Sequence, residues 1–180
     1  MIQQASVGVP YSATPDQPVS EWSAAIYRAL RNWAEDRRGQ WAWWDSTPGY
    51  LVLTIDRLES DEIEPVVLHT WDEELTVELR HWDAHFPDWN SGPTDDPAQV
   101  AAQAHAVADS WLSGNFALAV YFADEKWCGS RTIEANEDFH SRMADIESIK
   151  TFGPTRVELR WADKNRLKHF TLSDGQIVFP

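Results

Sequence analysis

The residues most suggestive of chemistry lie in one short segment, residues 81–86, whose sequence is HWDAHF. In an extended chain alternate side chains point to opposite faces, so His81, Asp83 and His85 would share one face. Two imidazoles and a carboxylate are the ligands of mononuclear iron sites and of some zinc enzymes. On a regular strand, however, the Cα atoms of His81 and His85 would lie roughly 13 Å apart, since each residue advances the chain by ~3.3 Å. The two histidines could share a metal only across a sharp bend of the backbone.

The apolar pattern around this segment indicates such a bend. The apolar residues before it are odd-numbered and those within it are even-numbered: Leu75, Val77, Leu79, then Trp82, Ala84 and Phe86. A bulge or a strand end near Arg80–Trp82 would reverse the parity in this way. A small metal-dependent enzyme that uses His81, Asp83 and His85 therefore stays open as an alternative. The simpler interpretation is that the aromatic face packs while the histidines and Asp83 are solvated and bond locally.

The other motifs supply no catalytic set. Cys128 is the only cysteine, which excludes an internal disulfide and any cysteine-rich zinc site, and no evident base lies near it in the sequence. The eight glycines are dispersed and form neither the dinucleotide-binding pattern nor the P-loop pattern. The patterns GxSxG, HExxH and paired CxxC are absent as well. We name no catalytic residue and expect no cofactor.

The charge of the chain restricts its partners. Its 180 residues contain 15 Lys and Arg against 29 Asp and Glu, a formal net charge of -14. Residues 150–180 hold six basic and three acidic side chains, so residues 1–149 carry -17. Such a surface repels nucleic acid and anionic membranes, which are bound through their phosphate groups. It fits a basic protein partner, because complementary charge speeds association. The alternative is that the acidity only maintains solubility.

Eleven tryptophans are available as core residues or as anchors for a partner. Trp22, Trp33, Trp111 and Trp161 fall on apolar positions of expected elements, which is typical of a core. Other tryptophans adjoin carboxylates in segments bounded by turns, where aromatic anchors contribute much of the energy of protein binding. We therefore predict a partner-binding surface formed by Trp71, Asp72, Glu73, Glu74, Asp83, Asp88 and Trp89. Trp89 and the Asp72–Glu74 cluster should be exposed.

The elements that would position these residues follow from periodicity. An amphipathic helix begins after Ser20 and ends near Gly39, with residues 1–17 as an irregular lead-in. Strands are expected at 41–46, 50–57, 63–71 and 74–82, and Pro65 places the third of them at an edge or a bulge. Residues 83–96 read as a long polar loop before a second helix capped by Asp96.

The rest of the chain continues with strands at 115–123 and 126–134, a weaker helix at 137–149, and a three-strand meander from residue 155 to the end. Short links between strands favour antiparallel pairing. Residues 18–180 are therefore predicted to form a single α+β domain: one largely antiparallel sheet with two or three helices packed on one face. The N-terminus lacks the features of a signal peptide, and no apolar run approaches the ~20 residues of a membrane span, so the cytoplasm is the expected compartment.

Three segments of residues 20–135 resemble uncharacterised bacterial proteins, some of which are immunity proteins encoded beside polymorphic toxins. They are the N-terminal amphipathic helix, the strand ending in HWDAHF, and the helix-then-strand block through Trp127-Cys128-Gly129-Ser130. The resemblance implies a non-catalytic protein that binds one toxin domain tightly. Together with the acidity, it favours an immunity or inhibitor protein that neutralises a basic enzyme, ahead of the metal-dependent enzyme and of a structural or regulatory domain.

Overall fold

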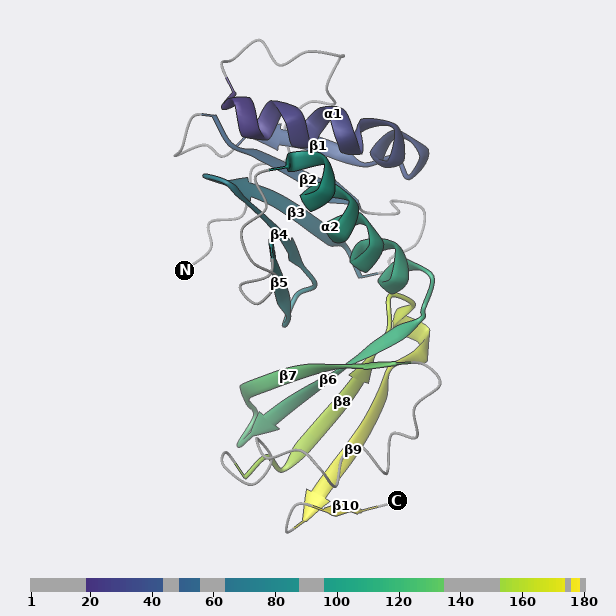
Figure 1. Cartoon of the computed structure of the whole chain (residues 1–180). Coiled ribbons are helices and arrows are strands. Elements are labelled where there is room, and N and C mark those ends of the chain that lie inside the picture. Colours follow the sequence, from purple (N-terminus) through teal and green to yellow (C-terminus); the bar gives the residue numbers. More distant parts are fainter. Residues whose placement is uncertain are drawn as a thin grey trace. The chain divides into compact units, whose positions relative to one another are not determined.

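The computed structural model describes residues 19–43, 49–55, 64–87, 96–134, 153–173 and 176–178 (Figure 1). The chain divides into two compact units, one formed by residues 1–61 and 65–108 and the other by residues 62–64 and 109–180. Two α-helices and two antiparallel sheets are present in the described ranges, which confirms the α+β class. None of the helices in these ranges is long and apolar enough to cross a membrane.

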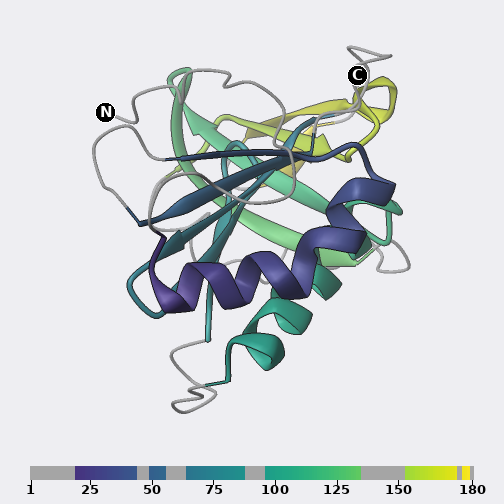
Figure 2. The same ribbon diagram turned by 90° about the horizontal axis from the view of Figure 1, so that it is seen from above.

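The first unit is a five-stranded sheet with helices on one face (Figures 1 and 2). Its elements in chain order are α1 (Glu21–Asp36), β1 (Gln40–Trp43), β2 (Leu51–Ile55), β3 (Val66–Trp71), β4 (Glu74–Glu78), β5 (Asp83–Phe86) and α2 (Pro97–Leu112). The strands pair in the order of the chain and each pair is antiparallel. The last residues of α2, from Asp109, belong to the second unit.

Capping and amphipathicity explain helix α1. The Ser20 side chain accepts a hydrogen bond from the Ser23 backbone amide at 3.0 Å, which satisfies one of the free N–H groups of the first turn. The apolar stripe is buried through Ile26, Leu30 and Trp33. The centroids of the Trp33 ring and of the His105 ring on α2 lie 4.8 Å apart, so the two helices also contact each other.

Strand register builds the core of the first unit. Leu53, Leu68 and Val77 lie opposite one another on β2, β3 and β4 and are almost fully buried. Burial of each such side chain stabilises the fold by roughly 1.5–3 kcal/mol. Because side chains alternate along a strand, the neighbours of these residues point to the opposite face of the sheet.

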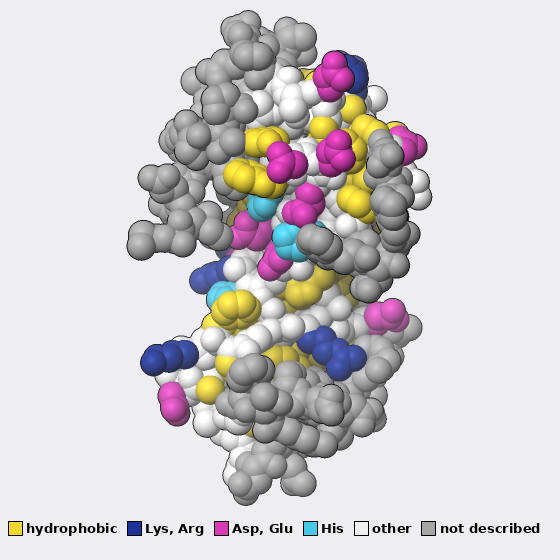
Figure 3. Space-filling view, turned by 60° about the vertical axis from the view of Figure 1, so that its left-hand side comes forward, with side chains coloured by type: hydrophobic (Ala, Val, Ile, Leu, Met, Phe, Trp, Pro, Cys, Tyr) yellow, Lys and Arg dark blue, Asp and Glu magenta, His cyan; other side chains and the backbone are white. Residues whose placement is uncertain are grey.

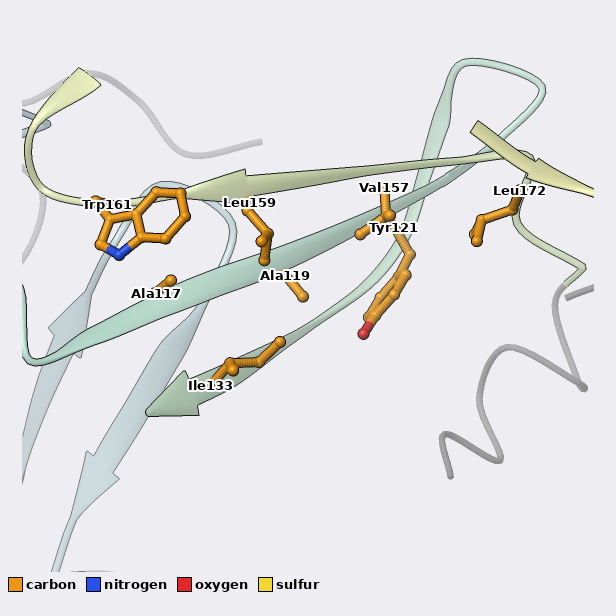
Figure 4. Packing of buried hydrophobic residues seen from close by; sticks show 8 residues of the cluster. All are labelled: Ala117, Ala119, Tyr121, Ile133, Val157, Leu159, Trp161 and Leu172. Atoms are coloured by element: carbon orange, nitrogen blue, oxygen red, sulfur yellow. The ribbon is translucent and has the colours of Figure 1, made fainter. Parts of the chain in front are cut away.

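The second unit is another five-stranded antiparallel sheet. Its elements are β6 (Phe116–Ala123), β7 (Lys126–Glu134), β8 (Arg156–Arg160), the short 3-10 helix η1 (Lys164–Arg166), β9 (Lys168–Ser173) and β10 (Gln176–Val178), and the strand order is β10-β9-β8-β6-β7. One face carries a buried cluster (Figure 4) formed by Ala117, Ala119, Tyr121, Ile133, Val157, Leu159, Trp161 and Leu172. Burial raises the pKa of Tyr121 in this cluster to about 12.

The structure has two antiparallel sheets, whereas the sequence predicted one, so the predicted number of sheets is wrong. Helix α2 intervenes between β5 and β6, and no strand of the first sheet pairs with a strand of the second in the described ranges. Periodicity identifies a strand but not its partner, so the number of sheets could not be read from it. The prediction of one domain over 18–180 stays a prediction. The lead-in at 1–17 and the helix at 137–149 lie outside the described residues.

Two local expectations are also corrected. Pro65 does not place its strand at an edge, because β3 begins after it, at Val66, and lies in the middle of the sheet. Residues 83–96 are not wholly a loop, since Asp83–Phe86 form β5, paired with β4. The helix after Asp96 is confirmed: the Asp96 carboxylate accepts a hydrogen bond from the Ala98 amide at 2.9 Å. The C-terminal meander is confirmed as β8, β9 and β10.

Candidate functional site

A tight turn between β4 and β5 explains the parity reversal. The Leu79 amide donates to the Trp82 carbonyl at 2.7 Å, and the Trp82 amide donates back to the Leu79 carbonyl at 3.2 Å. Arg80 within the turn has a φ of 51°, which a regular strand does not allow. The strand end predicted near Arg80–Trp82 is therefore confirmed. The turn folds β5 back against β4 and places Asp83 opposite Glu78.

The face of the first sheet that points away from the helices carries the polar residues of β3, β4 and β5. The register sets His69, Thr76 and His85 side by side across the three strands, with Trp71 opposite Glu74 in the next row. Figure 3 shows acidic and histidine side chains gathered on one face of the molecule, with hydrophobic side chains next to them.

An exposed aromatic pair lies at one end of this face. The rings of Tyr50 and Trp71 are stacked with centroids 5.1 Å apart and planes inclined by 22°. Trp71 stays 44% exposed, which makes it one of the few large hydrophobic side chains on the surface of the described ranges. The Tyr50 hydroxyl donates a hydrogen bond to Asp72 Oδ1 at 2.5 Å, and this bond to a carboxylate raises the pKa of Tyr50. The bond holds Tyr50 under the Trp71 ring.

A turn presents carboxylates directly beside the aromatic pair. Asp72 and Glu73 connect β3 to β4 and are both exposed, and Asp72 has a φ of 47°, a conformation that Asp tolerates better than most residues. Glu74 follows as the first residue of β4 and is half-buried. Exposed aromatic surface and negative charge are therefore adjacent on this hairpin.

A bridged histidine adjoins the carboxylates. His85 Nδ1 lies 2.6 Å from Glu74 Oε1, and His85 Nε2 lies 2.8 Å from Asp83 Oδ2. The Thr76 hydroxyl donates to the same Glu74 oxygen at 2.9 Å. The hydrogen bond that His85 donates to Glu74 is the largest cause that raises the pKa of His85, and partial burial opposes it. By contrast, burial is the largest cause that lowers the pKa of His69.

The structure brings most of the predicted partner-binding residues together. Trp71, Asp72, Glu73 and Asp83 are exposed and Glu74 is half-buried. Asp88 and Trp89 lie outside the described residues, so their exposure stays a prediction. Sequence reasoning missed Tyr50, His69 and Thr76. Thr76 shares a face with Glu74 by the period of two, whereas Tyr50 and His69 join the site only through the register of β2 and β3, which no local pattern specifies.

The alternative metal set is not assembled. In the portion of the chain that the structure describes, no group of three or more His, Cys, Asp and Glu side chains is arranged to hold a metal ion. His81 lies in the turn between β4 and β5, while Asp83 and His85 bond to each other. Burial raises the pKa of Cys128, which reduces its thiolate fraction and hence its reactivity.

Basic side chains of the second unit are engaged within their own sheet. Glu158, 8% exposed, bonds to Arg156 and to Arg160, and the distance from Arg160 Nε to Glu158 Oε2 is 2.9 Å. Burial alone would raise the pKa of Glu158, but the two guanidinium groups outweigh it and hold that pKa below its ordinary value. The guanidinium carbon of Arg166 lies 4.7 Å from the centroid of the Trp161 ring. Glu158 therefore neutralises part of the positive charge of Arg156 and Arg160 within the sheet.

Comparisons with protein-family models, with curated proteins and with solved structures find no match for this chain. The geometry and charge of the surface are therefore the basis from which a function is inferred.

Proposed function

We propose that the chain is a protein-binding domain whose surface around the β3–β4 turn receives a basic partner. The observation that carries the proposal is Trp71, exposed, stacked on Tyr50 and followed by three carboxylates, Asp72, Glu73 and Glu74. We call Tyr50, Trp71, Asp72, Glu73, Glu74 and Asp83 the acidic-aromatic surface.

The chemistry of this surface suits an arginine or lysine of the partner. A cation above an indole ring is attracted by the electrons of the ring, and Trp is the best aromatic residue for this contact. A guanidinium on Trp71 would have the Asp72 and Glu73 carboxylates within reach of its N–H groups, and such charge-assisted bonds are stronger than neutral ones. Tyr50 fixes the Trp71 ring in advance, which lowers the entropy lost on binding.

The finer proposal is an immunity or inhibitor protein that neutralises a basic bacterial toxin enzyme in the cytoplasm. It is supported by the charge of -17 on residues 1–149, which would attract a basic enzyme over a distance. It is also supported by the resemblance of three segments of residues 20–135 to uncharacterised bacterial proteins, some of which are immunity proteins. The metal-dependent enzyme receives no such support, because its three residues form no ligand group.

Matched tryptophan variants test the surface. Trp71 and Trp127 are 44% and 55% exposed and lie in different units, so truncation of either removes an exposed indole. We expect Trp71→Ala to weaken binding of a labelled oligoarginine peptide about fivefold, the effect of a surface cation–π contact, and Trp127→Ala to leave it nearly unchanged. Fluorescence anisotropy measures both. Equal losses in the two variants would contradict the proposal.

A second test addresses the toxin. If the adjacent reading frame encodes a protein with a basic C-terminal enzyme domain, the chain should inhibit that enzyme at equimolar amounts. Trp71→Ala should then weaken the complex by at least ~2 kcal/mol, about thirtyfold in Kd, with the thermal stability of the free chain retained. An enzyme that stays active in the presence of the chain would refute the immunity proposal and leave the basic-partner proposal to the peptide test.

A further inference from the structure

Both ring nitrogens of His85 face carboxylate oxygens, Glu74 Oε1 at 2.6 Å and Asp83 Oδ2 at 2.8 Å. An ionised carboxylate only accepts hydrogen bonds, so each ring nitrogen must donate one. Only the protonated imidazolium has two N–H groups. The bridge between β4 and β5 on this face therefore requires the proton on His85.

The charged surroundings of His85 come from three strands. On β3, His69 faces His85, and burial lowers the pKa of His69, which favours its neutral form. From β4 come Glu74 and Glu78, one row to either side of the Thr76–His85 pair. Burial raises the pKa of Glu78, and the charge of Asp83 raises it further. From β5 comes Asp83. Negative charge thus dominates around the imidazolium, in agreement with the raised pKa of His85.

Loss of the proton affects the two carboxylates differently. Neutral His85 keeps one N–H, and its retention at Nδ1 preserves the shorter of the two contacts, the one to Glu74 Oε1 at 2.6 Å. The Thr76 hydroxyl donates to the same Glu74 oxygen and lies 3.2 Å from Nδ1. The lone pair on Nε2 then faces Asp83 Oδ2 and repels it. The Asp83 side chain is 59% exposed, so it can turn outward without unpacking the core.

We propose that His85 is a proton-controlled latch that holds Asp83 at low pH and releases its charge to a basic partner as the pH rises. The inference rests on the proposed function of the acidic-aromatic surface. Because coupling between two sites is reciprocal, a bound cationic partner should in turn make His85 easier to deprotonate. Affinity for basic ligands therefore rises through the titration of this one histidine.

NMR titration of the whole chain tests the latch without a partner. His85 should titrate above the ordinary value of about 6.5. Glu74→Gln should lower its midpoint, because that carboxylate is the largest cause of the shift. The matched control is Glu78→Gln, on the same face of β4 but not hydrogen-bonded to His85 within the described ranges, and it should move the midpoint much less. A midpoint at or below about 6.5, or equal shifts in both variants, would overturn the latch.

Binding of the oligoarginine peptide tests the regulation. Between about pH 6 and about pH 9 the wild-type Kd should fall about threefold more than the Kd of His85→Gln, the effect of one exposed charge. Parallel pH profiles, with binding still sensitive to Trp71→Ala, would overturn the regulation and leave the proposed function intact. A peptide that binds at no pH, or binds equally to Trp71→Ala, would overturn the proposed function and the regulation with it.

Discussion

Thr70 shows how a single hydroxyl can join three elements. It is 1% exposed, bonds to the Ser23 hydroxyl of α1 at 2.7 Å, and accepts from the Leu51 amide of β2 at 2.9 Å. Buried polar groups that lose a partner keep the cost of their desolvation. The next residue in the chain is Trp71, so the same contact steadies the strand that carries the proposed anchor.

Removal of this hydroxyl should destabilise the first unit. Thr70→Val keeps the shape of the side chain but leaves the Ser23 hydroxyl and the Leu51 amide without this bond. We expect the free energy of unfolding to fall by about 2 kcal/mol. Thr132→Val is the control, because Thr132 is an exposed strand residue of β7. Urea denaturation that gives equal values for the two variants would argue against the role of this buried network.

At the scale of elements, periodicity predicts which segments are helices and strands, and tertiary register decides what they bring together. The stripe of Ile26, Leu30 and Trp33 identified α1, and the parity change identified the end of β4. The stack of Tyr50 on Trp71 needs the pairing of β2 with β3, which depends on the packed core rather than on local sequence. For the same reason, the sequence could indicate only that histidine and carboxylate residues cluster in this segment. It could not show that His85 bridges Glu74 and Asp83.

Strand β8 of the second unit offers a test of element-scale electrostatics. Arg156, Glu158 and Arg160 alternate along one face, and Glu158 has the lowered pKa of a paired carboxylate. A lowered folded-state pKa contributes stability above the unfolded pKa, and this stability is lost as the pH falls through the folded value. Glu158→Gln should therefore cost about 2 kcal/mol near neutral pH and progressively less in acid. Thermal unfolding across pH checks this, and a cost that does not depend on pH would contradict it.

At the scale of the whole molecule, charge governs how partners approach. The -17 on residues 1–149 should accelerate the encounter with a basic domain, and salt should screen that effect. Because the screening length falls from about 30 Å at 0.01 M salt to about 8 Å at 0.15 M, association should slow at least about tenfold over this range while dissociation changes less. Stopped-flow measurements give both rates. An association rate that is indifferent to salt would remove the electrostatic argument.

The most direct test of the acidic-aromatic surface compares two hairpin turns of the same composition. Asp72-Glu73 joins β3 to β4, and Asp124-Glu125 joins β6 to β7, and both Asp residues have nearly the same backbone φ, 47° and 48°. Reversal of either pair to lysine changes the net charge equally. The quantity to measure is the association rate with the basic partner at 0.15 M salt. At this salt concentration only charges within about 8 Å of the contact act strongly. We expect Asp72→Lys/Glu73→Lys to slow association about tenfold and Asp124→Lys/Glu125→Lys to leave it almost unchanged. Equal slowing by both, or no slowing by the first, would contradict it.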